Sequence, residues 1–397
     1  MRVLAERNNK DVAQDRASAA SKCFGSQFLD SFSFRKASSD SQSCSLKPTS
    51  SDRKSESLKD APQDFSTLDT QSTKETFLYL AYGSNLCDET FLGKRGIKPL
   101  SATNVLVPEL RMTFDLPGIP YAEPCFANSA KRDPRGQEDL APRDVVTSEK
   151  APLLREHKEY NKDKWKKGMV GVVYEVTAAD FAHIIATEGG GSSYQDVLVD
   201  CHALDADQTV PVPWTPKNES FKAHTLFAPA VPDGEEPPKD GGGFRRPDPS
   251  YAQASARYLK LITDGAKERK LPHEYQDYLN SLQPYTITTQ KQHLGQFIFS
   301  MLWVPIIMFI FSLNRQFQDE KGIAPAWLRL LTAGVFRAVW GSYDYFFKAL
   351  FGDGERTTDE KDERVAFQHR NAETASRGVV APDMTGDDEK SSINQPA

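Results

Sequence analysis

A short apolar run that breaks into a small polar turn is the feature that most constrains this 397-residue chain. Residues 77–81 read FLYLA, and they are followed by Tyr82 and then by Gly83-Ser84-Asn85. This pattern predicts a buried strand that ends abruptly, with consecutive backbone N–H groups and short side chains at one edge of a sheet. Because glycine lets the main chain come close to a ligand, such an edge is suited to holding a carboxylate or a developing oxyanion. The alternative is an ordinary strand followed by an ordinary turn.

Polar segments at both ends dilute the globular part of the chain. Hydrophobic residues make up 39% of the sequence, and the segments 1–75 and 352–397 are dominated by charged and small polar residues. We expect both segments to be disordered tails. The net charge of −6, without a broad basic patch, argues against nucleic acid as the main partner. The five cysteines show no metal-ligand spacing, which indicates free thiols in a reducing compartment rather than a metal site.

Between the tails, apolar periodicity and turn residues place the globular part at residues 76–284. Strands are expected at residues 77–81, 104–114, 170–176, 194–200 and 221–227. Helices are expected at residues 178–187, 250–264 and 272–282. Two inserts, 128–168 and 229–249, are charged or rich in proline and glycine, so we expect them to be surface loops.

The next part of the chain contains a long apolar segment. Residues 297–313 read FIFSMLWVPIIMFIFSL and carry no charge. A helix of this length extends about 25 Å, slightly less than the ~30 Å hydrocarbon core of a bilayer. Pro305 lies inside the segment, and a membrane-spanning helix tolerates such a proline. We therefore predict a transmembrane helix; the alternative is a buried core helix.

Residues 326–351 have the pattern of an aromatic-rich amphipathic helix. We expect this helix to lie in the headgroup plane of a membrane, and packing against a partner helix is the alternative. Together with the apolar segment it defines a predicted membrane-associated region at 294–351. Its expected apolar face consists of Trp327, Leu331, Val335, Val339, Tyr343, Phe346 and Leu350.

A carboxylate follows the helix expected at 178–187. Glu188 precedes three glycines, and glycine residues commonly end a helix. A negative charge at a helix C-terminus is slightly unfavourable with the helix dipole. The strand expected from Tyr194 would bring Glu188 to a sheet edge where a pocket can form. Taken alone, such a residue is most often a solvated carboxylate.

The order of these motifs resembles the γ-glutamylcyclotransferase family. FLYLAYGSNL, GVVYEV, TEGG and PSYAQASARYLKLITDGAKERKLPHEYQDYL occur here in the family's order, over about residues 76–282. The resemblance implies an α+β fold, a mixed β-barrel with flanking helices. It also implies conversion of a γ-glutamyl amino acid to 5-oxoproline and the free amino acid. Neither a metal nor an organic cofactor is implied.

The resemblance also implies roles for individual residues. Glu188 matches the family's catalytic glutamate, which takes a proton from the substrate's α-amine and delivers it to the departing amine. The backbone of the turn would bind the substrate and stabilise the oxyanion. Tyr194 and Tyr251 would hydrogen-bond the substrate carboxylate, unless they are core residues. The substrate-binding candidates are Tyr79, Leu80, Ala81, Tyr82, Gly83, Ser84, Asn85, Tyr194 and Tyr251.

One departure from the family leaves the substrate open. Leu226 stands where the family often has a tyrosine. A γ-glutamylamine or a γ-glutamylated secondary metabolite is therefore an alternative substrate. A non-catalytic, membrane-anchored binding protein on the same fold is the alternative from another class. The leading prediction is a membrane-attached cyclotransferase that acts on a small molecule and has its catalytic domain in the cytosol. The sequence does not determine its oligomeric state.

Overall fold

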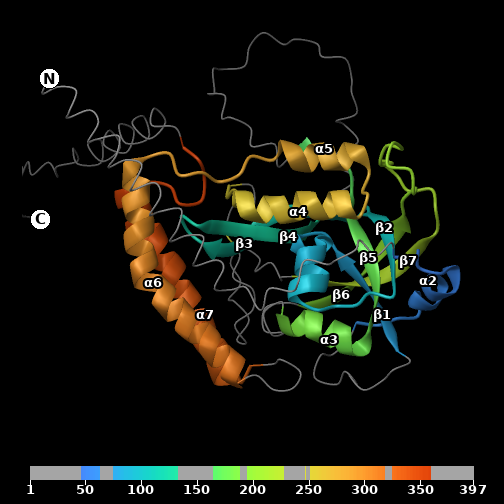
Figure 1. Cartoon of the computed structure of the whole chain (residues 1–397), viewed down its shortest axis with the longest axis horizontal. Helices are drawn as coiled ribbons and strands as arrows, with labels where there is room; N and C mark the ends of the chain where they lie inside the picture. Colours follow the sequence, from blue (N-terminus) through green and yellow to red (C-terminus); the bar gives the residue numbers. More distant parts are fainter. Residues whose placement is uncertain are drawn as a thin grey trace, which may run out of the picture. The chain divides into compact units, whose positions relative to one another are not determined.

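Five strands form a closed, mixed β-barrel in the computed structural model (Figure 1). The structure describes residues 46–62, 75–132, 164–187, 195–227, 246, 251–317 and 324–358. The barrel strands are β1 (Thr76–Ala81), β2 (Ser101–Val107), β5 (Met169–Thr177), β6 (Gln195–Ala203) and β7 (Ser220–Phe227). They follow the order β1-β5-β2-β6-β7, and β1 closes the barrel by pairing in parallel with β7. The predicted α+β class and the mixed barrel with flanking helices are confirmed.

Alternating side chains divide each barrel strand between two apolar environments, because successive residues of a strand point to opposite faces. Leu78 and Leu80 of β1 pack with Val173 of β5 in one buried cluster. Phe77 and Tyr79 belong to a second cluster, which includes residues of the covering helices. Both faces of β1 are therefore buried, which explains why residues 77–81 are apolar without a break.

A two-stranded ribbon stands beside the barrel strands, and the sequence analysis did not predict it. The expected strand at 104–114 is wrong, because β2 ends before Pro108 and β3 (Leu110–Ile119) begins after it. Proline has no N–H to donate to a strand ladder, so it suits the break. β3 pairs antiparallel with β4 (Glu123–Lys131). This strand takes up the start of the insert expected at 128–168, whose middle part lies outside the described residues.

Three helices cover the outer side of the barrel strands. α3 (Ala178–Thr187) agrees with its predicted range, and α5 (His273–Ser281) lies inside its own. α4 (Ala256–Glu268) begins later than predicted because Ser255 is its N-cap; the Ser255 Oγ accepts a hydrogen bond from the backbone N–H three residues on, at 3.1 Å. α4 and α5 lie side by side (Figure 1).

Part of the expected N-terminal tail is folded. α2 (Ser51–Ser57) lies within the range 1–75, so the prediction of disorder is wrong for the described residues 46–62. Arg53 donates hydrogen bonds to the carbonyl and the hydroxyl of Thr76, at 2.7 and 3.0 Å. These bonds tie the segment to the first residue of β1. The other residues of the predicted tail before Glu75 lie outside the described residues.

α6 (Gln290–Phe317) and α7 (Ala326–Ser342) lie side by side as an antiparallel pair (Figure 1). Trp303 Nε1 donates to Ser342 Oγ at 3.0 Å, and Asn314 Nδ2 donates to Thr332 Oγ1 at 3.3 Å. By length and composition, α6 is long and apolar enough to cross a membrane. Only 22% of the apolar window of α6 is buried inside the structure.

α7 packs on a partner helix, α6, which was the alternative to a helix alone in the headgroup plane. A π-helical turn (Tyr343–Phe347) and α8 (Lys348–Phe351) continue it. Some side chains of the predicted apolar face are buried and others are exposed. Val339 is fully buried, as is Tyr343 at the head of the π-helical turn, whereas Trp327 is 51% exposed.

The chain remains folded beyond α8, although residues 352–397 were predicted to be a disordered tail. Asp353 and Glu355 are 7% and 2% exposed, and the Gly354 N–H donates to Tyr343 Oη at 2.8 Å. The prediction is therefore wrong for residues 352–357. The compact unit that contains the barrel extends to Thr357, past the predicted boundary at 284. The part of the tail after residue 358 lies outside the described residues.

Candidate active site

β1 leads directly into the polar turn that the sequence analysis singles out. Ala81 is the last residue of β1, and a 3-10 turn covers Ser84–Leu86. The Gly83 carbonyl accepts a hydrogen bond from the Leu86 N–H at 3.1 Å, and the Ser84 carbonyl accepts one from the Cys87 N–H at 3.2 Å. The backbone of the turn is therefore held in one conformation by its own hydrogen bonds.

Asn85 holds the turn from inside. It is buried, and its Nδ2 donates to Tyr79 Oη at 2.9 Å. Tyr174 Oη, on β5, donates to the Asn85 carbonyl at 3.5 Å. Complete burial raises the pKa of Tyr174 well above its ordinary value, so its phenol stays protonated and able to donate. Asn85 and Tyr79 thus brace the turn, and their predicted contact with substrate stays a prediction.

The accessible part of the turn is short. Tyr82, Gly83 and Ser84 are partly exposed, whereas Leu80 and Ala81 are buried. The Leu80 side chain packs inside the barrel, so only its backbone is available for the binding role that we predicted for it. A ligand at this edge would therefore meet residues 82–84.

A tyrosine that the sequence analysis did not single out, Tyr258 of α4, lies beside this turn. A Cβ atom on Gly83 would lie 3.2 Å from Tyr258 Oη and 3.5 Å from Ala127 Cβ. Tyr258 Oη also accepts a hydrogen bond from the Ala127 N–H at 3.2 Å. The sequence signal that leads to Tyr258 is Ser255, because a helix capped there carries Tyr258 in its first turn.

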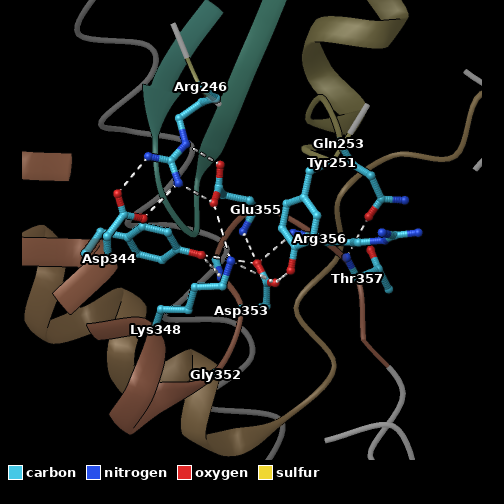
Figure 2. A network of polar contacts seen from close by, with 12 residues as sticks. Arg246, Tyr251, Gln253, Asp344, Lys348, Gly352, Asp353, Glu355, Arg356 and Thr357 are labelled. Atoms are coloured by element: carbon cyan, nitrogen blue, oxygen red, sulfur yellow. Dashed lines mark hydrogen bonds and ion pairs between the residues drawn. The ribbon is translucent and has the colours of Figure 1, made fainter. Parts of the chain in front are cut away.

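Tyr251 lies in a polar network with Lys348, Asp353 and Arg356, which follow α7 in the chain (Figure 2). Its hydroxyl donates to the Asp353 carboxylate, and its ring centre lies 4.4 Å from Lys348 Nζ. Burial, and after it the negative charge of Asp353, raises the pKa of the Tyr251 phenol far above its ordinary value. These two partners belong to α8 and to the residues after it. The structure therefore brings Tyr258, rather than Tyr251, to the turn after β1.

Two predicted site residues, Glu188 and Tyr194, lie outside the described residues. The elements on either side of them are described. α3 ends at Thr187, and β6 begins at Gln195, which pairs with Phe227 at the end of β7. The roles of Glu188 as the catalytic carboxylate and of Tyr194 as a substrate ligand stay predictions.

Leu226, the departure from the family pattern, is a buried core residue with 5% exposure. Nearby on the same strand, His224 is fully buried, with its Nδ1 2.7 Å from Asp196 Oδ2. The rings of Phe77 and Phe181 lie 5.4 and 5.3 Å from the imidazole. This histidine–carboxylate pair was not predicted, since its members are 28 residues apart in the sequence and only the pairing of β6 with β7 brings them together.

Known proteins resemble this chain over most of its length. The gamma-glutamyl cyclotransferase gliK of Aspergillus fumigatus is 31% identical over 280 residues, which make up 70% of this chain and 88% of that protein. The gamma-glutamyl cyclotransferase aclK of Aspergillus oryzae is 25% identical over 283 residues, or 70% of this chain and 89% of its own. A solved structure titled "Gamma-glutamyl cyclotransferase" is 18% identical, covers 54% of this chain and 93% of its own, and gives a TM-score of 0.33.

The C-terminal segment has its own match. A family model described as the AclK C-terminal domain matches residues 289–350, which span α6, α7 and most of α8. The match to the relative from Aspergillus fumigatus is much longer than this segment, at 280 residues. At 31% identity over 88% of that relative, this chain belongs to the γ-glutamyl cyclotransferase family.

Proposed function

We propose that this protein is an enzyme that cyclises the γ-glutamyl group of a small substrate to 5-oxoproline and releases the amine. The observation that carries the proposal is the turn after β1, braced from inside by the Asn85–Tyr79 hydrogen bond and bordered by Tyr258. A short, partly exposed stretch of backbone with a phenol at its side suits a substrate that offers a carboxylate and a carbonyl oxygen.

The proposed reaction needs orientation and one proton carrier. The substrate's α-amine attacks its own γ-carbonyl carbon, so that a new C–N bond forms and the former γ-amide C–N bond breaks. Because the attack is intramolecular, holding the chain folded supplies much of the rate. In the proposal Glu188 takes the proton from the α-ammonium group and later gives it to the leaving nitrogen. No water enters the products, and no cofactor is part of the proposal.

The course of α3 supports the choice of Glu188. The Ala178 N–H donates to the Glu75 carbonyl at 3.3 Å, so the helix begins beside the start of β1. Phe181 then stacks on Phe77, with ring centres 4.7 Å apart. Ten helical residues extend about 15 Å, and the six residues of β1 extend about 20 Å. α3 and β1 thus begin side by side, and a position for Glu188 beside the turn is part of the proposal.

Full-length purified protein is expected to release 5-oxoproline from at least one γ-glutamyl compound. A suitable panel contains a γ-glutamyl dipeptide, glutathione, a γ-glutamylamine and a γ-glutamyl conjugate of a bulky aromatic amine. Chromatography with mass detection would quantify 5-oxoproline and the released amine, which should appear in equal amounts because the reaction divides one molecule into two. Absence of product from every member of the panel would contradict the enzyme and favour the non-catalytic binding protein.

The preferred member of the panel would define the substrate class. We propose a γ-glutamyl amino acid as the substrate. Leu226 favours testing the γ-glutamylamine and the bulky conjugate beside it, because the buried leucine offers no hydroxyl to a substrate carboxylate. Faster turnover of either compound would replace the amino acid as the proposed leaving group without changing the proposed chemistry.

We also propose that α6 attaches the enzyme to a membrane, with the catalytic domain in the cytosol. The 28 residues of α6 extend about 42 Å, enough to cross a hydrocarbon core of ~30 Å. Large apolar side chains remain accessible along it, since Phe297, Met301 and Phe309 are 58%, 56% and 62% exposed. Such a continuous apolar surface is unusual on a soluble protein.

The membrane proposal predicts recovery of the full chain in a membrane pellet after a high-salt wash, and its release by detergent. Lysine at Phe297, Met301 and Phe309 should move the protein to the soluble fraction, because charges are costly in the hydrocarbon core. Lysine at Val210 and Trp214, which are 41% and 55% exposed outside α6, provides the matched control and should leave the protein in the pellet. Wild-type protein that stays soluble throughout would contradict membrane attachment.

A further inference from the structure

We propose that Tyr121 is a positioning residue of the cyclotransferase site. Through Tyr121, the C-terminal helical segment holds in place β4 and Tyr258, which form one side of the turn after β1. The C-terminal helical segment here means residues 290–317 and 324–357. The inference rests on the proposed function for its activity readout. Tyr121 lies in the short loop between β3 and β4. Three sets of contacts lead from it to the turn.

The first set joins Tyr121 to the C-terminal helical segment. The Tyr121 N–H donates to the Gly354 carbonyl at 2.8 Å, and its hydroxyl donates to the Gly352 carbonyl at 2.9 Å. Gln296 Nε2, near the start of α6, donates to the Tyr121 carbonyl at 2.8 Å. The backbone N–H, the backbone carbonyl and the side chain of one residue are thus all bound by the C-terminal helical segment.

Tyr121 has an unusual backbone conformation and is closely packed at this contact. Its φ angle is 65°, a left-handed conformation that tyrosine rarely adopts, yet its side chain is 1% exposed. The ring lies 6.0 Å from that of Phe299 on α6 and 5.7 Å from that of Tyr343. A Cβ atom on Gly354 would come within 3.0 Å of the Tyr121 ring, so the last part of the segment fits closely over it.

The second set joins the beginning of β4 to α4. Glu123 is 3% exposed, and it accepts hydrogen bonds from Ser255 Oγ at 2.7 Å and from Arg257 Nε at 2.8 Å. Ser255 is also the N-cap of α4. A shift of the loop at Tyr121 would therefore move a buried carboxylate and, with it, the start of the helix that carries Tyr258.

The third set reaches the turn itself. The rings of Phe126 on β4 and Tyr258 lie 5.1 Å apart, and the next residue, Ala127, donates its N–H to Tyr258 Oη. Ala127 Cβ and Tyr258 Oη are the atoms that a Cβ on Gly83 would meet. One side of the turn is thus formed by β4, which follows the loop that the C-terminal helical segment holds at Tyr121.

This arrangement gives the C-terminal helical segment a role in the site besides attachment to a membrane. If β4 and Tyr258 moved by a fraction of an ångström, the substrate would lose the geometry that the intramolecular attack requires. The structure therefore assigns the segment to the catalytic unit, in agreement with the single compact unit that extends to Thr357.

The test compares Tyr121→Ala with Tyr121→Phe in the full-length protein. Tyr121→Ala removes the buried ring and should lower kcat/KM for 5-oxoproline release about tenfold or more, because displacement of a positioning element is costly to an oriented reaction. Tyr121→Phe keeps the ring and both backbone hydrogen bonds, and should retain activity within about threefold of wild type. Asn314→Ala removes a hydrogen bond between α6 and α7 away from Tyr121, and should leave kcat/KM unchanged.

A second measurement keeps the inference independent of the enzyme assay. Hydrogen exchange of the backbone N–H groups of residues 84–87 and of Ala127 should become faster in Tyr121→Ala, and remain unchanged in Asn314→Ala. If wild-type protein cyclises no substrate, the proposed function fails, and the exchange result alone decides the coupling. If Tyr121→Ala does not fold, Gln296→Leu, which removes one hydrogen bond to Tyr121, replaces it in both measurements. Unchanged kcat/KM and unchanged exchange in a folded variant would overturn the proposal.

Discussion

Replacing Glu188 by glutamine is expected to lower kcat for 5-oxoproline release by about 10²- to 10⁴-fold, the usual contribution of a positioned acid–base group. Glutamine has nearly the same shape as glutamate, so binding and folding should be preserved. It cannot take a proton from the substrate's α-ammonium group at neutral pH, so the amine stays unreactive. The measurement is steady-state turnover of the best substrate in the panel, beside the thermal unfolding midpoint of each variant.

Asp180→Asn is the matched control for Glu188→Gln. Asp180 lies in the first turn of α3, at the opposite end of the helix from Glu188, so its replacement also removes one carboxylate from this element. Turnover of the Asp180→Asn protein should stay close to that of wild type. Equal turnover in the Glu188→Gln protein would remove this residue from the proposed mechanism, while leaving the proposed reaction to be explained by another base.

Arg246→Ala is expected to cost about 3–5 kcal/mol of folding free energy, the usual effect of breaking a buried charge pair. Arg246 donates to both Asp344 and Glu355, with distances of 2.8 to 2.9 Å (Figure 2). Its guanidinium also lies 4.1 Å from the centre of the Trp340 ring. Burial acts to lower the pKa of Arg246, but the hydrogen bonds that it donates to both carboxylates, and their negative charges, outweigh burial and raise the pKa. The loss leaves Glu355, which is 2% exposed, without its main partner.

Urea unfolding followed by tryptophan fluorescence would measure the effect of Arg246→Ala. The exposed Arg337 of α7 provides the control, and Arg337→Ala should change the free energy by less than about 0.5 kcal/mol. Replacing Arg246 and Glu355 together by methionine should be less harmful than Arg246→Ala, because neither charge is then left buried alone. A loss no larger than that of the control would show that the network does not stabilise the fold.

The same variant should respond to pH in a defined direction. Burial raises the pKa of Glu355, even though Arg246 acts to lower it. A carboxyl group with a raised pKa in the folded state favours folding when it is protonated, and this contribution is lost as the pH rises through the folded pKa. Without Arg246 the raised pKa should rise further. The difference in the free energy of unfolding between wild type and Arg246→Ala should therefore become smaller as the pH falls from about 7 toward about 5.

Local patterns predicted much of the barrel. The apolar run at 77–81 and the polar turn after it were predicted correctly. A strand buried on both faces and a glycine-containing turn each have a characteristic pattern of a few adjacent residues. The same reason accounts for α3, where apolar residues recur at helical spacing before a run of glycines. The range at 104–114 failed because an apolar run does not reveal which strand each half joins.

The site shows where local patterns stop being informative. Tyr251 was predicted from its resemblance to a tyrosine of the family, whereas Tyr258, which the sequence analysis did not single out, lies beside the turn. The cap at Ser255 is decided by its partners, since its hydroxyl also donates to the buried Glu123 of β4. That bond joins residues 132 positions apart, and no short segment records it.

The amino-acid sequence by itself determined the strand, the turn at Gly83 and an apolar helix long enough to cross a membrane, while the α+β class was implied by the resemblance to the family. Each of these depends on the order of neighbouring residues. Only the tertiary structure decided that Tyr258 borders the turn, that Arg246 links the two carboxylates, and that Tyr121 is held by residues at 296 and 352–354. These contacts depend on buried polar groups finding partners far away along the chain, which is a property of the packed molecule rather than of any segment.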